Sequence, residues 1–217
     1  MLGVTFGDKH SYWDWGLLLK SYPEITPPEP KTKMVDVPGT DGMLDLSETL
    51  TGHVQYETRK IKCEFVTKIS RAEWPFICSE IYDYLHGMIR DIVMDDDPDY
   101  FYRGRVTIEK REVVKTMTME ITVVAEVEPY KTKLHETTAY RDMTVKDSLT
   151  VNVFGARKPV VPAFNASAEM QMLFHGNSYT LPKGDSQFPD VVIREGDNEF
   201  TFAGNGTVSI MYREGRF

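Results

Sequence analysis

The densest group of side chains that could do chemistry is a run of four aspartates, Asp95, Asp96, Asp97 and Asp99. Hard cations such as Ca²⁺ take several carboxylate oxygens as ligands, so a metal site is the first interpretation to consider. An EF-hand loop, however, spaces its ligands at alternate positions around a Gly and ends in a Glu, and Pro98 interrupts that spacing. The run therefore predicts a solvated turn that leads into a strand, and no residue is assigned as a metal ligand.

The cysteines and histidines give no stronger pattern. Cys63 and Cys78 form no C-x-x-C pair, which argues against zinc binding and thiol redox chemistry and predicts that both are reduced and buried. The histidines are widely spaced and include no H-E-x-x-H motif, so each is expected to be structural or at the surface. The five are His10, His53, His86, His135 and His175.

The chain contains no G-x-S-x-G nucleophile elbow, no P-loop and no dinucleotide-binding fingerprint. No pair of residues is nominated as nucleophile and base. The sequence therefore predicts that the chain is not an enzyme and has no catalytic residue, no cofactor-binding residue and no cofactor. A hydrolase whose nucleophile and base are brought together only by the fold stays open as an alternative.

The tryptophans are the side chains best suited to contact a partner or a sugar ring, because each combines a large apolar face with a polar tip. Trp74 falls on the apolar face of an expected helix and is assigned to the core. Trp13 and Trp15 alternate with Asp14, which indicates either an exposed contact face or plain core packing. Both tryptophans are candidate interface residues, and three prolines of a nearby segment are added to them. The candidates are Trp13, Trp15, Pro27, Pro28 and Pro30.

Charge and composition exclude several classes of partner. The 217-residue chain has a net charge of −8 and a pI of about 5.2, and residues 1–133 carry 17 Lys and Arg against 23 Asp and Glu. A grip on nucleic-acid phosphates needs clustered Lys and Arg, so nonspecific DNA binding is disfavoured. No apolar stretch reaches the ~18 residues of a membrane span, and charged residues interrupt the N-terminus where a signal peptide would be apolar. We expect a soluble protein without membrane insertion, made in the cytoplasm.

Prolines and short apolar runs organise the N-terminal segment. Residues 2–7 and 12–19 are compatible with strands. Four prolines between positions 23 and 30 disfavour regular helix and central sheet. Residues 22–33 are therefore predicted to form an extended, polyproline-like arm or connector.

One helix is expected. Ser70 with Glu73 makes a capping-box pattern, and apolar residues at helical spacing follow toward Gly87, a natural C-cap. Pro75 fits poorly so soon after Ser70, so the helix is expected to begin later or to bend at its start.

A period of two dominates the rest of the first 133 residues. Apolar positions between 54 and 65 alternate with one phase slip at Arg59-Lys60, which is typical of a β-bulge. Residues 100–108 and 117–127 also alternate and predict a long antiparallel hairpin with its turn near 110–115.

The chain changes character after Pro129, and we place a domain boundary near 133–140. Short strands are expected at the spacing of a sandwich, over 149–154, 160–165, 168–174, 178–181, 189–194, 198–202 and 206–213. The predicted fold class is mainly β (α+β). An N-terminal antiparallel β domain with one α-helix and a long hairpin, residues 1–133, is followed by a β-sandwich domain, residues 134–217.

The most informative stretch is 38–65, in which glycine turns precede an alternating strand. Pro38-Gly39, Asp41-Gly42 and Thr51-Gly52 are turn dipeptides, and Gly39 and Gly42 are expected in conformations that a β-carbon would penalise. The stretch resembles the PG-DG-LDLSE-LTG segment of the distal tail protein of long-tailed phages. Other pieces that resemble the family, in order along the chain, are residues 5–17, 70–87, 95–105 and 204–217.

The resemblance implies a structural role at the distal end of a phage or prophage tail. In the family, the N-terminal domain forms a homo-hexameric ring that leaves a channel for DNA, and the C-terminal domain is a galectin-like sandwich. The implied partners are further copies of the chain, the tail tube protein, and a tail-associated tip, lysin or fibre protein at the baseplate. The implied location is the virion tail tip, after synthesis in the cytoplasm of the host bacterium.

Two alternatives are kept. The first is a carbohydrate-binding β-sandwich module for adhesion, and the second is a cell-wall hydrolase. Residues 134–217 contain no Trp, and Phe174, Phe200 and Phe202 follow strand alternation, so we expect a docking platform and not a sugar site. The excess of acids in residues 1–133 predicts that DNA passes the channel without specific binding.

Overall fold

The computed structural model describes residues 2–39, 41–49, 51–67, 69–115 and 118–217. Thr40 and Leu50 of the turn-rich stretch and Met117 of the predicted hairpin lie outside the described residues. The chain divides into two compact units, Met1–Pro129 with Phe217, and Tyr130–Arg216. β11 (Lys131–Lys133) and its partner strand β18 (Gly215–Arg216) both fall in the second unit.

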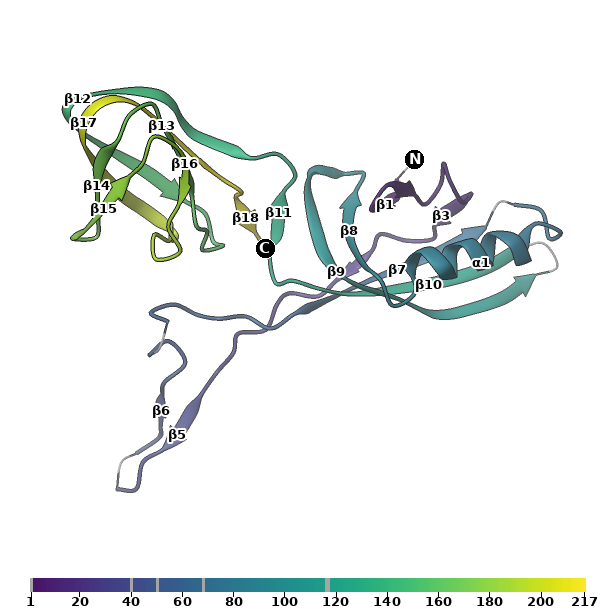
Figure 1. The fold of residues 1–217 in the computed structure, drawn as a ribbon. Helices are drawn as coiled ribbons and strands as arrows, with labels where there is room; N and C mark the ends of the chain where they lie inside the picture. Colours follow the sequence, from purple (N-terminus) through teal and green to yellow (C-terminus); the bar gives the residue numbers. More distant parts are fainter. Residues whose placement is uncertain (1, 40, 50, 68, 116–117) are drawn as a thin grey trace. The chain divides into compact units, whose positions relative to one another are not determined.

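The first unit is built on an antiparallel sheet with the strand order β2-β1-β8-β9-β10-β7-β3, and β4 pairs with β7 at its edge (Figure 1). Ile61, Cys63 and Phe65 point into the core and the residues between them do not, which confirms that part of the predicted alternation. The strands are β1 (Val4–Phe6), β2 (Lys9–His10), β3 (Leu17–Leu19), β4 (Glu24–Ile25), β7 (Arg59–Thr67), β8 (Ile89–Met94), β9 (Asp97–Lys115) and β10 (Thr118–Val127).

Helix α1 (Trp74–Leu85) covers one face of this sheet (Figure 1). It begins after Ser70, as the position of Pro75 predicts, because proline is tolerated in the first turn of a helix. Half of the capping box forms: the Glu73 carboxylate accepts hydrogen bonds from the Ser70 amide and hydroxyl, at 3.2 and 2.7 Å. Gly87, just beyond the helix, has a φ of 78°. The helix is confirmed, and Trp74 lies in the core.

The long hairpin of β9 and β10 is confirmed, but its limits differ from the prediction. β9 continues to Lys115, so residues 110–115 are strand and not turn. The bulge predicted at Arg59-Lys60 is wrong: β7 begins at Arg59 and pairs with β10 without a shift of register up to Val66. The phase slip in the sequence marks the start of a strand, because the residues before it belong to a different element.

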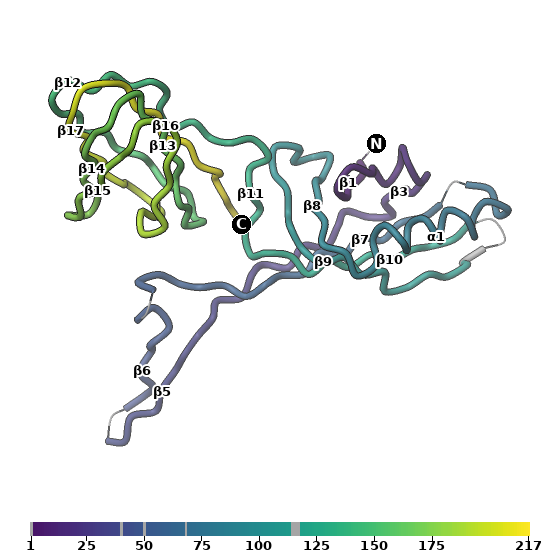
Figure 2. Tube along the Cα trace, viewed as in Figure 1, coloured from purple at the N-terminus to yellow at the C-terminus, as the bar shows by residue number. Residues whose placement is uncertain are grey.

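That element is an arm, which we define as residues 26–58. It contains β5 (Met34–Asp36) and β6 (Met43–Asp45), which pair with each other in a separate two-stranded sheet. Figure 2 traces the chain through β5 and β6 and back to β7. Within residues 22–33, predicted as an extended, polyproline-like arm or connector, β4 forms a two-residue edge strand between Pro23 and Pro27, where missing amide donors are tolerated.

The second unit has a six-stranded sheet with the order β15-β14-β17-β13-β16, and β12 pairs with β17. Phe164, Phe200 and Phe202 are fully buried in its core. A mainly β fold with one helix among the described residues is thereby confirmed. The strands are β12 (Thr137–Gly155), β13 (Ala163–Ala166), β14 (Met170–Phe174), β15 (Asn177–Leu181), β16 (Gly184–Gln187) and β17 (Gly196–Tyr212).

Three strand predictions in this unit are wrong. Residues 189–194 form no strand, and Ile193 makes only an isolated bridge to Val160. Strands 198–202 and 206–213 are one strand, β17, because the glycines expected to form a turn between them remain paired with β12. β12 starts at Thr137, within a stretch taken as a polar connector.

Candidate functional site

Two surfaces of the first unit contain the candidate interface residues, and the first is the turn between β2 and β3. Trp13 is 78% exposed, whereas Trp15 is 1% exposed and donates its indole N–H to Glu80 Oε1 at 3.3 Å. The expectation of a shared exposed face is therefore wrong for Trp15, which lies in the core. The physical reason is that residues 11–15 form a turn, so residues two apart do not share a face as they would in a strand.

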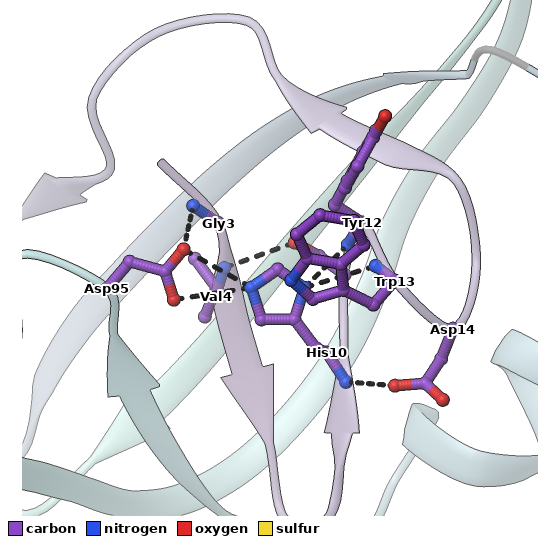
Figure 3. Close-up of polar contacts among 8 residues, drawn as sticks. Gly3, Val4, His10, Tyr12, Trp13, Asp14 and Asp95 are labelled. Atoms are coloured by element: carbon purple, nitrogen blue, oxygen red, sulfur yellow. Dashed lines mark hydrogen bonds and ion pairs between the residues drawn. The ribbon is translucent and has the colours of Figure 1, made fainter. Parts of the chain in front are cut away.

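The Trp13 side chain is held in place from its base. Its backbone N–H donates to His10 Nδ1 at 3.2 Å, and its ring meets the Tyr12 ring edge-on, with centroids 4.8 Å apart (Figure 3). The His10 ring lies 6.1 Å away on another side. A large aromatic side chain whose surroundings are already ordered loses little conformational freedom when a partner covers it.

His10 organises this turn. Its Nδ1 accepts hydrogen bonds from the amides of both Tyr12 and Trp13, so Nε2 carries the proton and faces the Asp95 carboxylate, 3.2 Å from each oxygen. Asp95 also accepts from the Gly3 amide at 2.7 Å, and Asp14 accepts from the His10 amide at 2.7 Å (Figure 3). These contacts link the turn to β1 and to the loop after β8.

The run of aspartates at 95–99 lies beside this turn and forms, as predicted, a turn that leads into a strand. Asp95 and Asp96 form the tight turn between β8 and β9, and Asp97 is the first residue of β9. Over the described ranges, no three His, Cys, Asp or Glu side chains are arranged to hold a metal ion. Sequence reasoning missed the link between Asp95 and His10, because no local pattern relates residues 85 positions apart.

The buried cysteines have no geometry for nucleophilic chemistry. Cys63 and Cys78 are buried and free, as predicted. Burial raises the pKa of the Cys63 thiol to about 12, so it remains protonated at neutral pH. Cys78 Sγ lies 3.5 Å from Met119 Sδ inside the core. His86 is structural, because its Nδ1 accepts the amide N–H of Ile108 at 3.2 Å.

The second surface is the arm, which holds the three candidate prolines. Pro27 and Pro30 are exposed and Pro28 is half-buried. Pro30 forms a bridge with Tyr56 across the base of the arm, where Lys31 and Glu57 donate their amides to backbone oxygens of the opposite strand at 2.8 Å. The base of the arm is therefore a ladder of backbone hydrogen bonds and not a free linker.

Beyond this base, the arm exposes apolar side chains that sequence reasoning did not single out. Met34, Met43 and Leu44 are all exposed, and none of the described residues in 31–58 is buried. Met34-Val35-Asp36 and Met43-Leu44-Asp45 show no period-two alternation, so only the turn glycines between the two strands leave a sequence signal. Such a patch on an extended element is typical of a surface that packs on another molecule.

The described part of the chain contains no helix long and apolar enough to cross a membrane. No protein-family model matches the sequence, and no curated protein does. Among solved structures, the chain is similar to the crystal structure of the SPP1 Dit protein (gp 19.1), described as a paradigm of the hub adsorption apparatus in phages that infect Gram-positive bacteria. The TM-score is 0.73 with 11% identity, and the match covers 100% of both chains. The chain thus has the fold of this phage hub protein, which confirms the resemblance to distal tail proteins at the level of fold.

Proposed function

We propose that this chain is a structural distal tail protein of a phage or prophage, which connects the tail tube to the tip or baseplate. The observation that carries the proposal is the fold match, because it spans both compact units and the whole length of each chain. A fold hosts many functions in general, so the assignment needs the surfaces as well. The exposed arm and the Trp13 turn are surfaces suited to assembly.

The proposed assembly is a homo-hexameric ring in which the arm of one subunit packs on its neighbour. Met34, Met43 and Leu44 provide the apolar contact, and the prolines at the arm's base restrict its backbone before binding. The tail tube protein and a tip, lysin or fibre protein are the proposed partners on the two faces of the ring. The proposed location is the virion tail tip, after synthesis in the host bacterial cytoplasm.

The ring is proposed to leave a channel that DNA crosses without specific binding. Residues 1–133 contain 6 more acidic than basic residues, 23 against 17, so repulsion of a polyanion is favoured over retention. A gel-shift experiment with duplex DNA at about physiological salt tests this point. Tight retention of the duplex would contradict it.

Light scattering on the purified full chain, alone and with a tail tube protein, tests the ring. The expected mass is that of six copies in at least one of the two samples. A monomer at every concentration, with the tube protein present, would contradict the hexamer. If tip or fibre proteins bind neither the isolated chain nor the ring, the connecting role is contradicted.

A further inference from the structure

His10 holds the Trp13 turn through a ring nitrogen that must stay unprotonated. Its Nδ1 accepts the backbone N–H of Tyr12 at 3.1 Å and that of Trp13 at 3.2 Å (Figure 3). A histidine nitrogen accepts hydrogen bonds only while it carries no proton, and both ring nitrogens are donors in the imidazolium form. The observed geometry therefore belongs to the neutral ring. In a protonated ring, the new N–H would point at two backbone N–H groups.

The ring cannot turn away from these two amides while the chain around it stays in place. A β-carbon on Gly3 would lie 2.5 Å from His10 Cε1, so the ring packs directly on the backbone beside β1. Its Nε2 lies 3.2 Å from both oxygens of the Asp95 carboxylate. The next residue, Ser11, is fully buried, and its amide donates to the Val4 oxygen at 2.8 Å. The exposed end of the turn is therefore the part that has to move when the ring is protonated.

The charged groups around His10 oppose this movement only in part. Asp95, in the loop after β8, favours an imidazolium, and Asp14, in the same turn, accepts the His10 amide. The Asp95 side chain is 30% exposed, so water screens its attraction for a charged ring. Lys9, the preceding residue on β2, lies 3.7 Å from Glu80 of α1, and the β1 residues beside the ring carry no charge. The contact with Asp95 exists in both protonation states, whereas the two amide contacts exist only in the neutral one.

We propose that His10 is a pH-sensitive switch of the Trp13 turn, in which a solvent proton taken up by Nδ1 releases the amides of Tyr12 and Trp13. Histidine changes its charge between about pH 5 and 8, so the turn is ordered above this range and released below it. Trp13 then loses the fixed base that makes it a preorganised contact surface. A protein that packs on the ordered Trp13 ring would bind at neutral pH and be released in acid. The switch belongs to this turn alone and does not depend on ring formation by the chain.

The test measures hydrogen exchange of the Tyr12 and Trp13 amides in the full chain, expressed as protection relative to unstructured chain at the same pH. Protection in the parent chain is expected to be at least about tenfold lower at about pH 5 than at about pH 8. His10→Asn should remove this difference. The side-chain oxygen of Asn accepts hydrogen bonds in place of Nδ1 and does not titrate in this range, so both amides should stay protected.

A second variant changes the charge that faces the ring. Asp95→Asn keeps an oxygen that accepts the Gly3 amide, which Asp95 binds at 2.7 Å, but removes the negative charge beside His10. An opposite charge nearby favours the charged form of a titrating group. The midpoint of the loss of protection should therefore move to lower pH in this variant.

The matched control is His86→Asn, because His86 Nδ1 also accepts a backbone amide, that of Ile108 at 3.2 Å. It should leave the pH dependence at the Trp13 turn unchanged. The proposal is overturned if the parent amides are equally protected at both pH values, if His10→Asn retains the difference, or if His86→Asn abolishes it. If His10→Asn protects the amides at neither pH, the Asp95→Asn midpoint decides: a shift to lower pH supports the switch, and an unchanged or higher midpoint overturns it.

Discussion

The sheet of the first unit and the arm that interrupts it contain similar strands in opposite surroundings. In β7, every second side chain is buried beneath α1 and neighbouring strands, whereas β5 and β6 bury no side chain at all. Both form antiparallel pairs, but the apolar residues of β5 and β6 are adjacent, as in Met43-Leu44, and do not alternate. The difference shows that antiparallel pairing alone does not bury a strand: a covering element such as α1 is needed before its side chains stabilise the fold.

The comparison predicts that core and arm substitutions affect different quantities, and the largest effect is in the sheet. Phe65→Ala is expected to lower the free energy of unfolding by about 3–5 kcal/mol, because Phe65 is fully buried and the change leaves a cavity. Leu44→Ala on the arm is the matched control and should change it by less than about 0.5 kcal/mol. Urea unfolding of both variants measures this. Equal losses would show that the arm is part of the subunit core.

A second prediction concerns assembly instead of unfolding, and here the arm variant is expected to have the larger effect. Met43→Asp with Leu44→Asp is expected to weaken ring formation at least about 100-fold, because two charges would be buried against the neighbour. The unfolding free energy of the monomer should stay unchanged. Phe76→Asp, at an apolar residue on α1 that is more exposed than either arm residue, is the control and should still assemble. Light scattering across a concentration series distinguishes the variants, and unchanged assembly of the double variant would remove the arm from the interface.

The sequence alone predicts the sheet better than the arm, and the reason is local. Ile61, Cys63 and Phe65 have one buried face, so period-two alternation reveals them, and Pro75 indicates where α1 can begin. β5 and β6 have no buried face in their own subunit, so no alternation of burial marks them. Only the turn glycines between them leave a sequence signal.

The candidate site residues divide along the same line. Trp13 and Trp15 look equivalent in sequence, but the turn that contains them sends one to solvent and the other to the core. Contacts between distant residues, such as His10 with Asp95, follow from strand order and cannot be obtained from spacing. The exposure of Phe154, which lies on β12 and is 71% exposed, cannot be predicted from the sequence for a related reason. An outward position on a strand looks like an inward one until the register is known.

A third prediction concerns the turn at the end of the arm. Gly42 has a φ of 79°, and a β-carbon there would meet no atom within 4 Å, so the cost of a side chain is conformational and not steric. Gly42→Val is expected to destabilise the arm hairpin by about 1–2 kcal/mol. Hydrogen exchange of the β5 and β6 amides should report this, with sheet amides unchanged. The neighbouring Met43→Val is the control, since Met43 lies in strand β6, where a β-branched residue is well accommodated. Identical exchange in both variants would contradict the turn geometry.

The smallest expected effect is on the pH dependence of stability. It concerns two carboxylates, Asp8 in the unit that contains the sheet and Asp45 in the arm. The Tyr84 hydroxyl donates to Asp8 and thereby lowers the pKa of that carboxyl, and in the arm the Ser47 hydroxyl and amide lower the pKa of Asp45. Asp8 and Tyr84 are 76 residues apart and meet only in the folded chain, whereas Asp45 and Ser47 are neighbours that can meet without the sheet. Only the first contact should couple the pH dependence of stability to folding of the sheet.

The sign of this coupling follows from the direction of the shift. A carboxyl whose pKa is lower in the folded state contributes stability that is complete above its unfolded pKa and is lost as the pH falls through its folded pKa. Tyr84→Phe keeps the ring but removes the donor, so its destabilisation should be larger at about pH 6 than at about pH 3. Ser47→Ala should show no such difference in global unfolding. Urea titrations of the parent chain and both variants at the two pH values measure it. If Tyr84→Phe lowers the unfolding free energy equally at both pH values, the contribution of the Asp8 contact does not depend on the charge of Asp8. Titration of Asp8 is then no more coupled to global folding than titration of Asp45 in the arm.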